Sequence, residues 1–261
     1  STASWRNGGG IAEPNSRYPI RALYPRHDLN GASIRTEIKT YKMVKEKRLK
    51  AVLFDMDGVL LDSEEYICRA GIMMFKEKGF EVSPEDFLEF TGMGENRYLG
   101  GVAEKNGIPF ELEKDKARTY EIYGDIVRGK LEPFEGVVDF IENCRQRGLK
   151  LAVASSADPP KVNINLAEIG IPASTFDTVV SGLDIEHKKP APDIFLKAAA
   201  NLGERASDCL VIEDAVSGVA AGKAAGAKVL ALTSSFAAKE LSEADWIADL
   251  LTDVGDEVLD W

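Results

Sequence analysis

The sequence predicts an α/β fold: a Rossmann-like, doubly wound parallel sheet with an inserted α-helical cap subdomain. Two patterns carry this prediction. Short apolar runs alternate with helix patterns along most of the 261 residues, and one long stretch after the first run contains helix patterns alone. Alternating strands and helices are typical of a parallel sheet that is covered by helices on both faces.

The first predicted strand covers residues 49–54, an apolar run that ends directly before Asp55. Such a run between polar residues indicates a buried strand. The next stretch is too long for an ordinary crossover and contains helix patterns that glycine-containing turns separate. We therefore expect a helical cap over residues 65–131, above the carboxyl edge of the sheet. Its predicted helices are 65–78, 84–90, 95–106 and 112–128.

The chain then returns to the alternating pattern, so residues 49–64 and 132–261 together form the predicted core. Functional sites in such sheets lie at the carboxyl ends of the strands, so polar residues that follow a strand are the first candidates. The remaining predicted strands are 150–155, 178–181, 209–212 and 228–233, and the predicted helices are 137–147, 161–169, 192–202 and 215–225.

Two carboxylates, Asp55 and Asp57, follow the first strand. At the end of a buried strand they repel each other and are costly to desolvate, so a metal ion or a reacting electrophile is the expected compensation. A calcium loop is excluded, because Gly58 comes too early and Leu60 and Leu61 supply no side-chain oxygen at the later ligand positions. A plain acidic turn is the alternative without chemistry.

Glu213 and Asp214 end a later apolar run in the same way. If both strands are central and parallel, the two pairs of acids meet at one edge of the sheet. An oxygen-rich cluster of this kind suits Mg²⁺, a hard ion that keeps waters and phosphate oxygens as ligands. Taken alone, Asp214 is equally a candidate cap for the helix that follows.

Two further segments supply groups that can bind or neutralise an anion. Ser155 and Ser156 follow the second core strand, where hydroxyl and backbone N–H groups can hold phosphate oxygens. Lys188 and Lys189 precede Pro190, and a lysine at this edge would neutralise a nucleophile and a transferring group. Alone, each element favours a helix cap or a solvated face, but the four elements together indicate a catalytic site.

In order, these elements resemble the four motifs of the haloacid dehalogenase-like (HAD) hydrolase superfamily. The similarity covers residues 49–250, and the inserted helices resemble the β-phosphoglucomutase-like branch with its helical cap. The cap segment 90–103 is similar to bacterial phosphatases and to a plant thylakoid protein. The matching motif segments are 55–64, 153–156, 189–195 and 211–218.

The resemblance implies roles for four catalytic residues. Asp55 is the expected nucleophile, which forms an aspartyl-phosphate, and Asp57 is the expected general acid and base. Ser155 is expected to bind the transferring phosphoryl group. Lys189 is expected to offset the charge between Asp55 and the phosphate.

The resemblance also implies Mg²⁺ as the cofactor and a set of substrate contacts. The expected ligands are the Asp55 carboxylate, the Asp57 backbone carbonyl and Asp214, with Glu213 as a further ligand or as a neighbour of one. The substrate contacts are expected from Ser155, Ser156, Lys189, Glu95 and Arg97.

The favoured activity is a Mg²⁺-dependent phosphatase that hydrolyses a small phosphomonoester, such as a sugar phosphate. Asp57 and Asp214 argue against a metal-free dehalogenase. A sugar phosphomutase of this branch is the first alternative, but it needs a basic cap residue for a second phosphate, and the chain has Glu95 there, with Arg97 two positions later. The second alternative is a HAD-fold subunit of a larger assembly, tethered by its N-terminal arm.

That arm is predicted from charge. The whole chain carries −11, but residues 1–50 contain eleven Lys and Arg against four Asp and Glu, so they carry +7 and the rest −18. An acidic body excludes nucleic acid as a partner, and no apolar run has the length of a membrane span. We expect a basic arm, 1–48, with a short helix at 33–47, that docks on a protein partner; a solvated tail is the alternative.

Three cysteines and two histidines exclude a disulfide scaffold, a multi-histidine zinc site and a histidine-centred triad. Free cysteines in a chain of this length indicate a reducing compartment. The start of the chain contains Ser and Arg with few acids, which resembles part of a transit peptide. The predicted location is therefore the cytoplasm or the plastid stroma.

Overall fold

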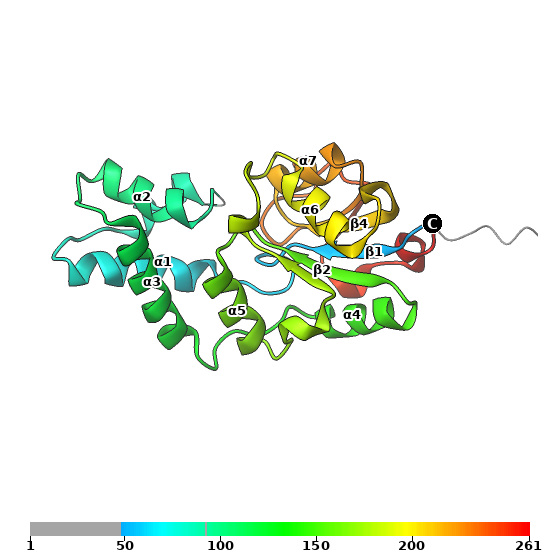
Figure 1. Ribbon diagram of the computed structural model, residues 1–261, viewed down its shortest axis with the longest axis horizontal. Helices are drawn as coiled ribbons and strands as arrows, with labels where there is room; N and C mark the ends of the chain where they lie inside the picture. The colour runs from blue at the N-terminus through cyan, green and yellow to red at the C-terminus, as the bar shows by residue number, and fades with distance from the viewer. Residues whose placement is uncertain (1–47, 92) are drawn as a thin grey trace, which may run out of the picture. The chain divides into compact units, whose positions relative to one another are not determined.

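The computed structural model describes residues 48–91 and 93–261 (Figure 1). It confirms the predicted fold class. Six parallel strands form one sheet in the order β3-β2-β1-β4-β5-β6. The predicted helix at 33–47 and the predicted arm, apart from Arg48, lie outside the described residues.

Five of the six strands fall where the sequence predicts them. The sixth, β6, was missed because its three residues, none of them fully buried, stand alone between Asp245 and Asp249. A short edge strand lacks the continuous apolar run that marks a central parallel strand. The strands are β1 (Ala51–Phe54), β2 (Lys150–Ala154), β3 (Thr178–Val180), β4 (Cys209–Glu213), β5 (Lys228–Leu232) and β6 (Trp246–Ala248).

Helices cover both faces of the sheet, as Figure 1 shows. Val52 and Phe54 of β1 pack in the same apolar cluster as residues of α4 and α5. Ala51 and Leu53 point to the other face and share a cluster with residues of α6 and α7. This alternation of a fully buried strand explains why its sequence is apolar at every position. The four helices are α4 (Val137–Gln146), α5 (Pro159–Glu168), α6 (Asp193–Leu202) and α7 (Val216–Ala224).

The predicted helical stretch between β1 and β2 contains α1 (Glu64–Glu77), α2 (Glu95–Lys105) and α3 (Leu112–Val127). The prediction of one helix over 84–90 is wrong, since this segment forms two 3₁₀ turns. Phe87 and Phe90 are both buried and lie three residues apart, which is the repeat of a 3₁₀ helix, and the N–H of each bonds to the carbonyl three residues back.

Helix α3 packs against α1 and also against the core helix α5. Two buried polar contacts join α3 to residues of the core: Lys116 Nζ lies 2.7 Å from Asp158 Oδ2, and the Tyr123 hydroxyl donates to Asn165 Oδ1. In the described part of the chain, no helix has both the length and the apolar character that a bilayer crossing needs.

Candidate active site

The carboxyl ends of β1, β2 and β4 bring the predicted site residues to one edge of the sheet. Phe54 of β1 pairs in register with Val153 of β2 and with Ile212 of β4. The next residue, Asp55, donates its backbone N–H to the Ile212 carbonyl at 3.0 Å. Asp55 therefore lies level with the ends of both neighbouring strands, where the other motif residues begin.

The turn after β1 depends on Gly58. Its φ is +81°, in the left-handed region that favours glycine, and its N–H donates to the Leu61 carbonyl at 2.8 Å. A Cβ at this position would lie 1.9 Å from Asp214 Oδ2. The absent side chain thus lets the Asp214 carboxylate approach the loop that carries Asp55 and Asp57.

Lys189 bridges two carboxylates. Its Nζ lies 2.5 Å from Asp55 Oδ1 and 2.6 Å from Glu213 Oε1, and only 8% of its side chain is exposed. Burial alone would lower the pKa of Lys189, but the two carboxylates outweigh it, so the pKa lies above its usual value. Lys189 is therefore a fixed ammonium next to the predicted nucleophile.

Three buried carboxylates meet beside this lysine. Asp55, Glu213 and Asp214 each offer an oxygen, and these oxygens lie within 4.8 Å of one another. Burial, offset in part by Lys189, raises the pKa of Asp55 to about 7. Burial, Glu213 and Asp55 raise the pKa of Asp214 to about 8. A hard divalent cation fits this donor set, because it would relieve the crowding of negative charge.

Glu213 already has three protein partners. Oε1 contacts Lys189, while Oε2 accepts the backbone N–H groups of Asp214 at 2.9 Å and Ala215 at 3.0 Å. A carboxylate has about four lone-pair sites. Most of its capacity is therefore used to orient Lys189 and the loop after β4.

A cavity of about 520 Å³ opens above these residues. Among its lining residues are Ser155, which is 2% exposed, and Ser156. The Ser155 Oγ accepts the N–H of Ala157 at 3.2 Å, so the loop after β2 folds back around this hydroxyl. The cavity joins all four predicted motifs. Asp55, Asp57, Ser155, Ser156, Lys189, Glu213 and Asp214 all line it.

Of the two substrate contacts predicted in the cap, only Glu95 lines the cavity. Glu95, the first residue of α2, lines the cavity with 7% of its surface exposed, and its Oε2 is buried without a hydrogen-bond partner. Burial raises the pKa of Glu95 to about 7, in spite of the nearby Lys161. Arg97 is not among the lining residues: it pairs with Glu104 at 2.7 Å and lies over the Phe90 ring at 5.0 Å. The geometry thus gives the prediction for Arg97 no support.

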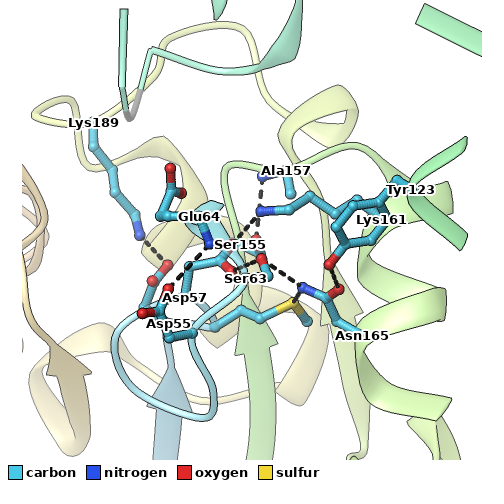
Figure 2. Close-up of polar contacts among 12 residues, drawn as sticks. Asp55, Asp57, Ser63, Glu64, Tyr123, Ser155, Ala157, Lys161, Asn165 and Lys189 are labelled. Atoms are coloured by element: carbon cyan, nitrogen blue, oxygen red, sulfur yellow. Dashed lines mark hydrogen bonds and ion pairs between the residues drawn. The ribbon is translucent and has the colours of Figure 1, made fainter. Parts of the chain in front are cut away.

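A polar network around Asp57 was not predicted from the sequence (Figure 2). The Lys161 Nζ lies 2.6 Å from Asp57 Oδ2, and the Ser63 hydroxyl donates to Asp57 Oδ1. Behind Ser63, Asn165 donates to its Oγ at 3.4 Å and accepts from the Tyr123 hydroxyl. One signal was available: Lys161 and Asn165 are four residues apart, so they share the face of α5 that Val162 and Leu166 bury.

Burial opposes the charge on Lys161, which is 3% exposed. The carboxylates of Asp57, Glu64 and Glu95 outweigh this effect and hold the pKa of Lys161 above its usual value. The cavity edge that faces the cap therefore contains a buried cation, in contact with Asp57.

Comparison with known proteins agrees with the resemblance that the four motifs carry. Residues 49–226 match the model of the family described as haloacid dehalogenase-like hydrolase. The chain is 33% identical over 216 residues to protein CbbY of Rhodobacter capsulatus, covering 77% of this chain and 94% of that protein. The crystal structure of CbbY from Rhodobacter sphaeroides in complex with phosphate has a TM-score of 0.72 at 25% identity, covering 79% of this chain and 96% of that one.

A plant relative is more similar in sequence but much longer. The chain is 44% identical over 201 residues, or 76% of its length, to the chloroplastic protein SUPPRESSOR OF QUENCHING 1 of Arabidopsis thaliana. Those residues make up 19% of the plant protein. The comparison therefore concerns one part of that relative and not its whole activity.

Proposed function

Because the chain belongs to the haloacid dehalogenase-like hydrolase family, we propose that it is a Mg²⁺-dependent phosphatase that hydrolyses a small phosphomonoester through an aspartyl-phosphate on Asp55. The observation that carries the proposal is the placement of Asp55: its carboxylate faces the cavity, next to a fixed ammonium and a second carboxylate pair. A small phosphomonoester in the cavity would lie beside the nucleophile Asp55, the proton donor Asp57 and the ammonium of Lys189.

The first half of the reaction transfers the phosphoryl group to Asp55. A carboxylate oxygen of Asp55 attacks phosphorus while the bond to the leaving oxygen breaks, and Asp57 gives its proton to that oxygen. Ser155 and the N–H groups of its loop hold the transferring oxygens. Lys189 lowers the repulsion between Asp55 and the phosphate, which is the electrostatic stabilisation that phosphoryl transfer requires.

The second half of the reaction hydrolyses the aspartyl-phosphate and regenerates the free enzyme. A water oxygen attacks phosphorus, its proton passes to Asp57, and the bond between phosphorus and the Asp55 oxygen breaks. Mg²⁺, when bound, supplies positive charge that lets a phosphate dianion approach the carboxylates. The Asp55 and Asp214 carboxylates and the Asp57 carbonyl are the proposed ligands. The three hydrogen bonds that Glu213 accepts support its role as a neighbour that orients Lys189.

Mg²⁺ is expected to raise the thermal stability of the protein. A ligand that binds only the folded state at 100 times its dissociation constant adds about 2.7 kcal/mol. We expect a higher unfolding temperature in Mg²⁺ than in EDTA at equal ionic strength, and no such shift for Asp214→Asn. An equal shift in the two proteins would contradict the proposed metal site. The matching activity test is phosphate release from a panel of phosphomonoesters with and without Mg²⁺.

The charge of the cavity favours a phosphatase over a mutase. Of its described lining residues, seven are Asp or Glu and two are Lys, and both lysines are already paired with carboxylates. A second phosphate on the substrate would find no unpaired lysine in this lining. We therefore propose a leaving group that carries hydroxyls, which Glu95 is placed to bind.

Replacing Glu95 with Ala is expected to raise KM for a sugar monophosphate by about tenfold to a hundredfold, because one hydrogen bond to a charged group is worth about 1.5–3 kcal/mol. KM for p-nitrophenyl phosphate, whose leaving group has no hydroxyl beyond the ester, should change little. Thermal stability should hold or rise, since the buried unpartnered oxygen is removed. Glu104→Ala on the exposed side of α2 is the matched control. Unchanged KM for every sugar phosphate would overturn the role of Glu95.

A further inference from the structure

We infer that Lys161 is a positioning residue that holds the Asp57 carboxyl group in the orientation needed for proton transfer to the leaving group. This inference rests on the proposed function, because it assumes that Asp57 is the general acid and base. It adds a residue that lies outside the four motif segments, on the first turn of α5.

The two oxygens of Asp57 are held from two directions. Lys161 approaches Oδ2 at 2.6 Å, and Ser63 donates to Oδ1 (Figure 2). Two donors on opposite oxygens fix the rotation of a carboxyl group, which a single donor leaves free. Each oxygen has a second lone pair, so a proton can still be held on Asp57 and passed to a substrate. The two contacts therefore fix the orientation of the Asp57 carboxyl group and still allow it to transfer a proton.

Both donors are themselves held rigidly. Ser63 is fully buried and accepts from Asn165, which in turn accepts from Tyr123 of α3. Lys161 is 3% exposed and has Glu64 and Glu95 as further carboxylate neighbours. A buried lysine that serves stability alone is a poor choice, because an apolar side chain of similar volume is often as stabilising. Its contact with a group that must move a proton supplies the reason for its presence.

Positioning matters most when the leaving group needs a proton. The oxygen of an alkyl phosphate departs as an alcohol and requires Asp57, whereas p-nitrophenolate departs without a proton. General acid catalysis contributes about 10²–10⁴-fold. Loss of Lys161 should therefore slow the first turnover of an alkyl ester far more than that of p-nitrophenyl phosphate.

The experiment measures single-turnover release of the leaving group from glycerol phosphate and from p-nitrophenyl phosphate, with Mg²⁺ present. For Lys161→Met we expect a loss of about 10²-fold or more with the alkyl ester and less than about fivefold with the aryl ester. Lys161→Arg, which keeps the charge, should recover part of the alkyl rate. Lys161→Met in an Asp57→Asn background should cause no further loss.

Lys116→Met is the matched control. Lys116 is also a buried lysine with a carboxylate partner at the start of α5, Asp158, but it does not contact Asp57. If the loss came from damage to folding or to α5, Lys161→Met and Lys116→Met would each slow the alkyl ester and the aryl ester by the same factor. Equal losses on both esters for Lys161→Met, or additive loss with Asp57→Asn, would overturn the inference. If Asp57→Asn slows the alkyl ester and the aryl ester by the same factor, the proposed role of Asp57 as general acid is contradicted instead.

Discussion

Replacing Asp55 with Asn is expected to lower kcat for phosphomonoester hydrolysis by about 10⁴-fold or more, because the nucleophile of the covalent step is lost. The fold should survive. Burial already disfavours the charged form of Asp55, as its pKa of about 7 indicates, and Asn has the same shape. The measurement is phosphate release by both proteins over the same panel of esters, together with their thermal unfolding.

The control for this variant is Asp139→Asn, which replaces an exposed acid on α4 that is not among the residues lining the cavity. It changes the net charge by the same amount and should retain full activity. Equal activity of the wild type and Asp55→Asn would rule out the aspartyl-phosphate route. Loss of activity in both variants would point to an effect of net charge and not to loss of the nucleophile.

Replacing Lys189 with Met is expected to destabilise the protein by about 3–5 kcal/mol in EDTA, the usual effect of removing one partner from a buried ion pair. Asp55 and Glu213 would be left facing each other without the ammonium that lies between them. The loss should be smaller in Mg²⁺, because a bound cation offsets part of the repulsion. Urea unfolding in the two buffers measures both values.

Lys114→Met serves as the control for this prediction. Lys114 is 73% exposed and pairs with Glu111, and such surface pairs contribute about 0–1 kcal/mol. Its replacement should leave stability nearly unchanged in both buffers. A Lys189→Met protein that is as stable as the wild type in EDTA would show that the bridge between the two carboxylates contributes nothing to the fold.

Sequence patterns predicted the parts of the molecule that depend on continuous burial. Strands β1, β2, β4 and β5 are central in the sheet and almost wholly buried, so their apolar runs are unbroken and easy to recognise. The edge strand at Trp246 has no such run, because one side of it faces solvent. The 84–90 segment has helix-forming residues, but it buries Phe87 and Phe90 at the three-residue spacing of a 3₁₀ turn.

The site was predictable where function follows from position along the chain. Asp55, Ser155 and Glu213 come at the ends of adjacent parallel strands, and parallel pairing alone brings them together. Lys161 was missed because its role depends on which face of α5 meets the cavity, which the strand pattern does not define. The resemblance also implied a substrate contact for Arg97, but Arg97 pairs with Glu104 and is not among the lining residues, because two positions along a helix point to different sides.

Direct detection of a phosphoryl group on Asp55 tests the central claim most closely. The protein is mixed with Mg²⁺ and its best substrate from the panel, quenched within the first turnover, and treated with borohydride, which reduces an aspartyl-phosphate to homoserine. Peptide mass spectrometry then reads the residue at position 55. We predict homoserine at that position in the wild type, only with substrate and Mg²⁺, and none in Asp55→Asn. Hydrolysis that proceeds with unmodified Asp55 at every quench time, or with the label on another residue, would contradict the account.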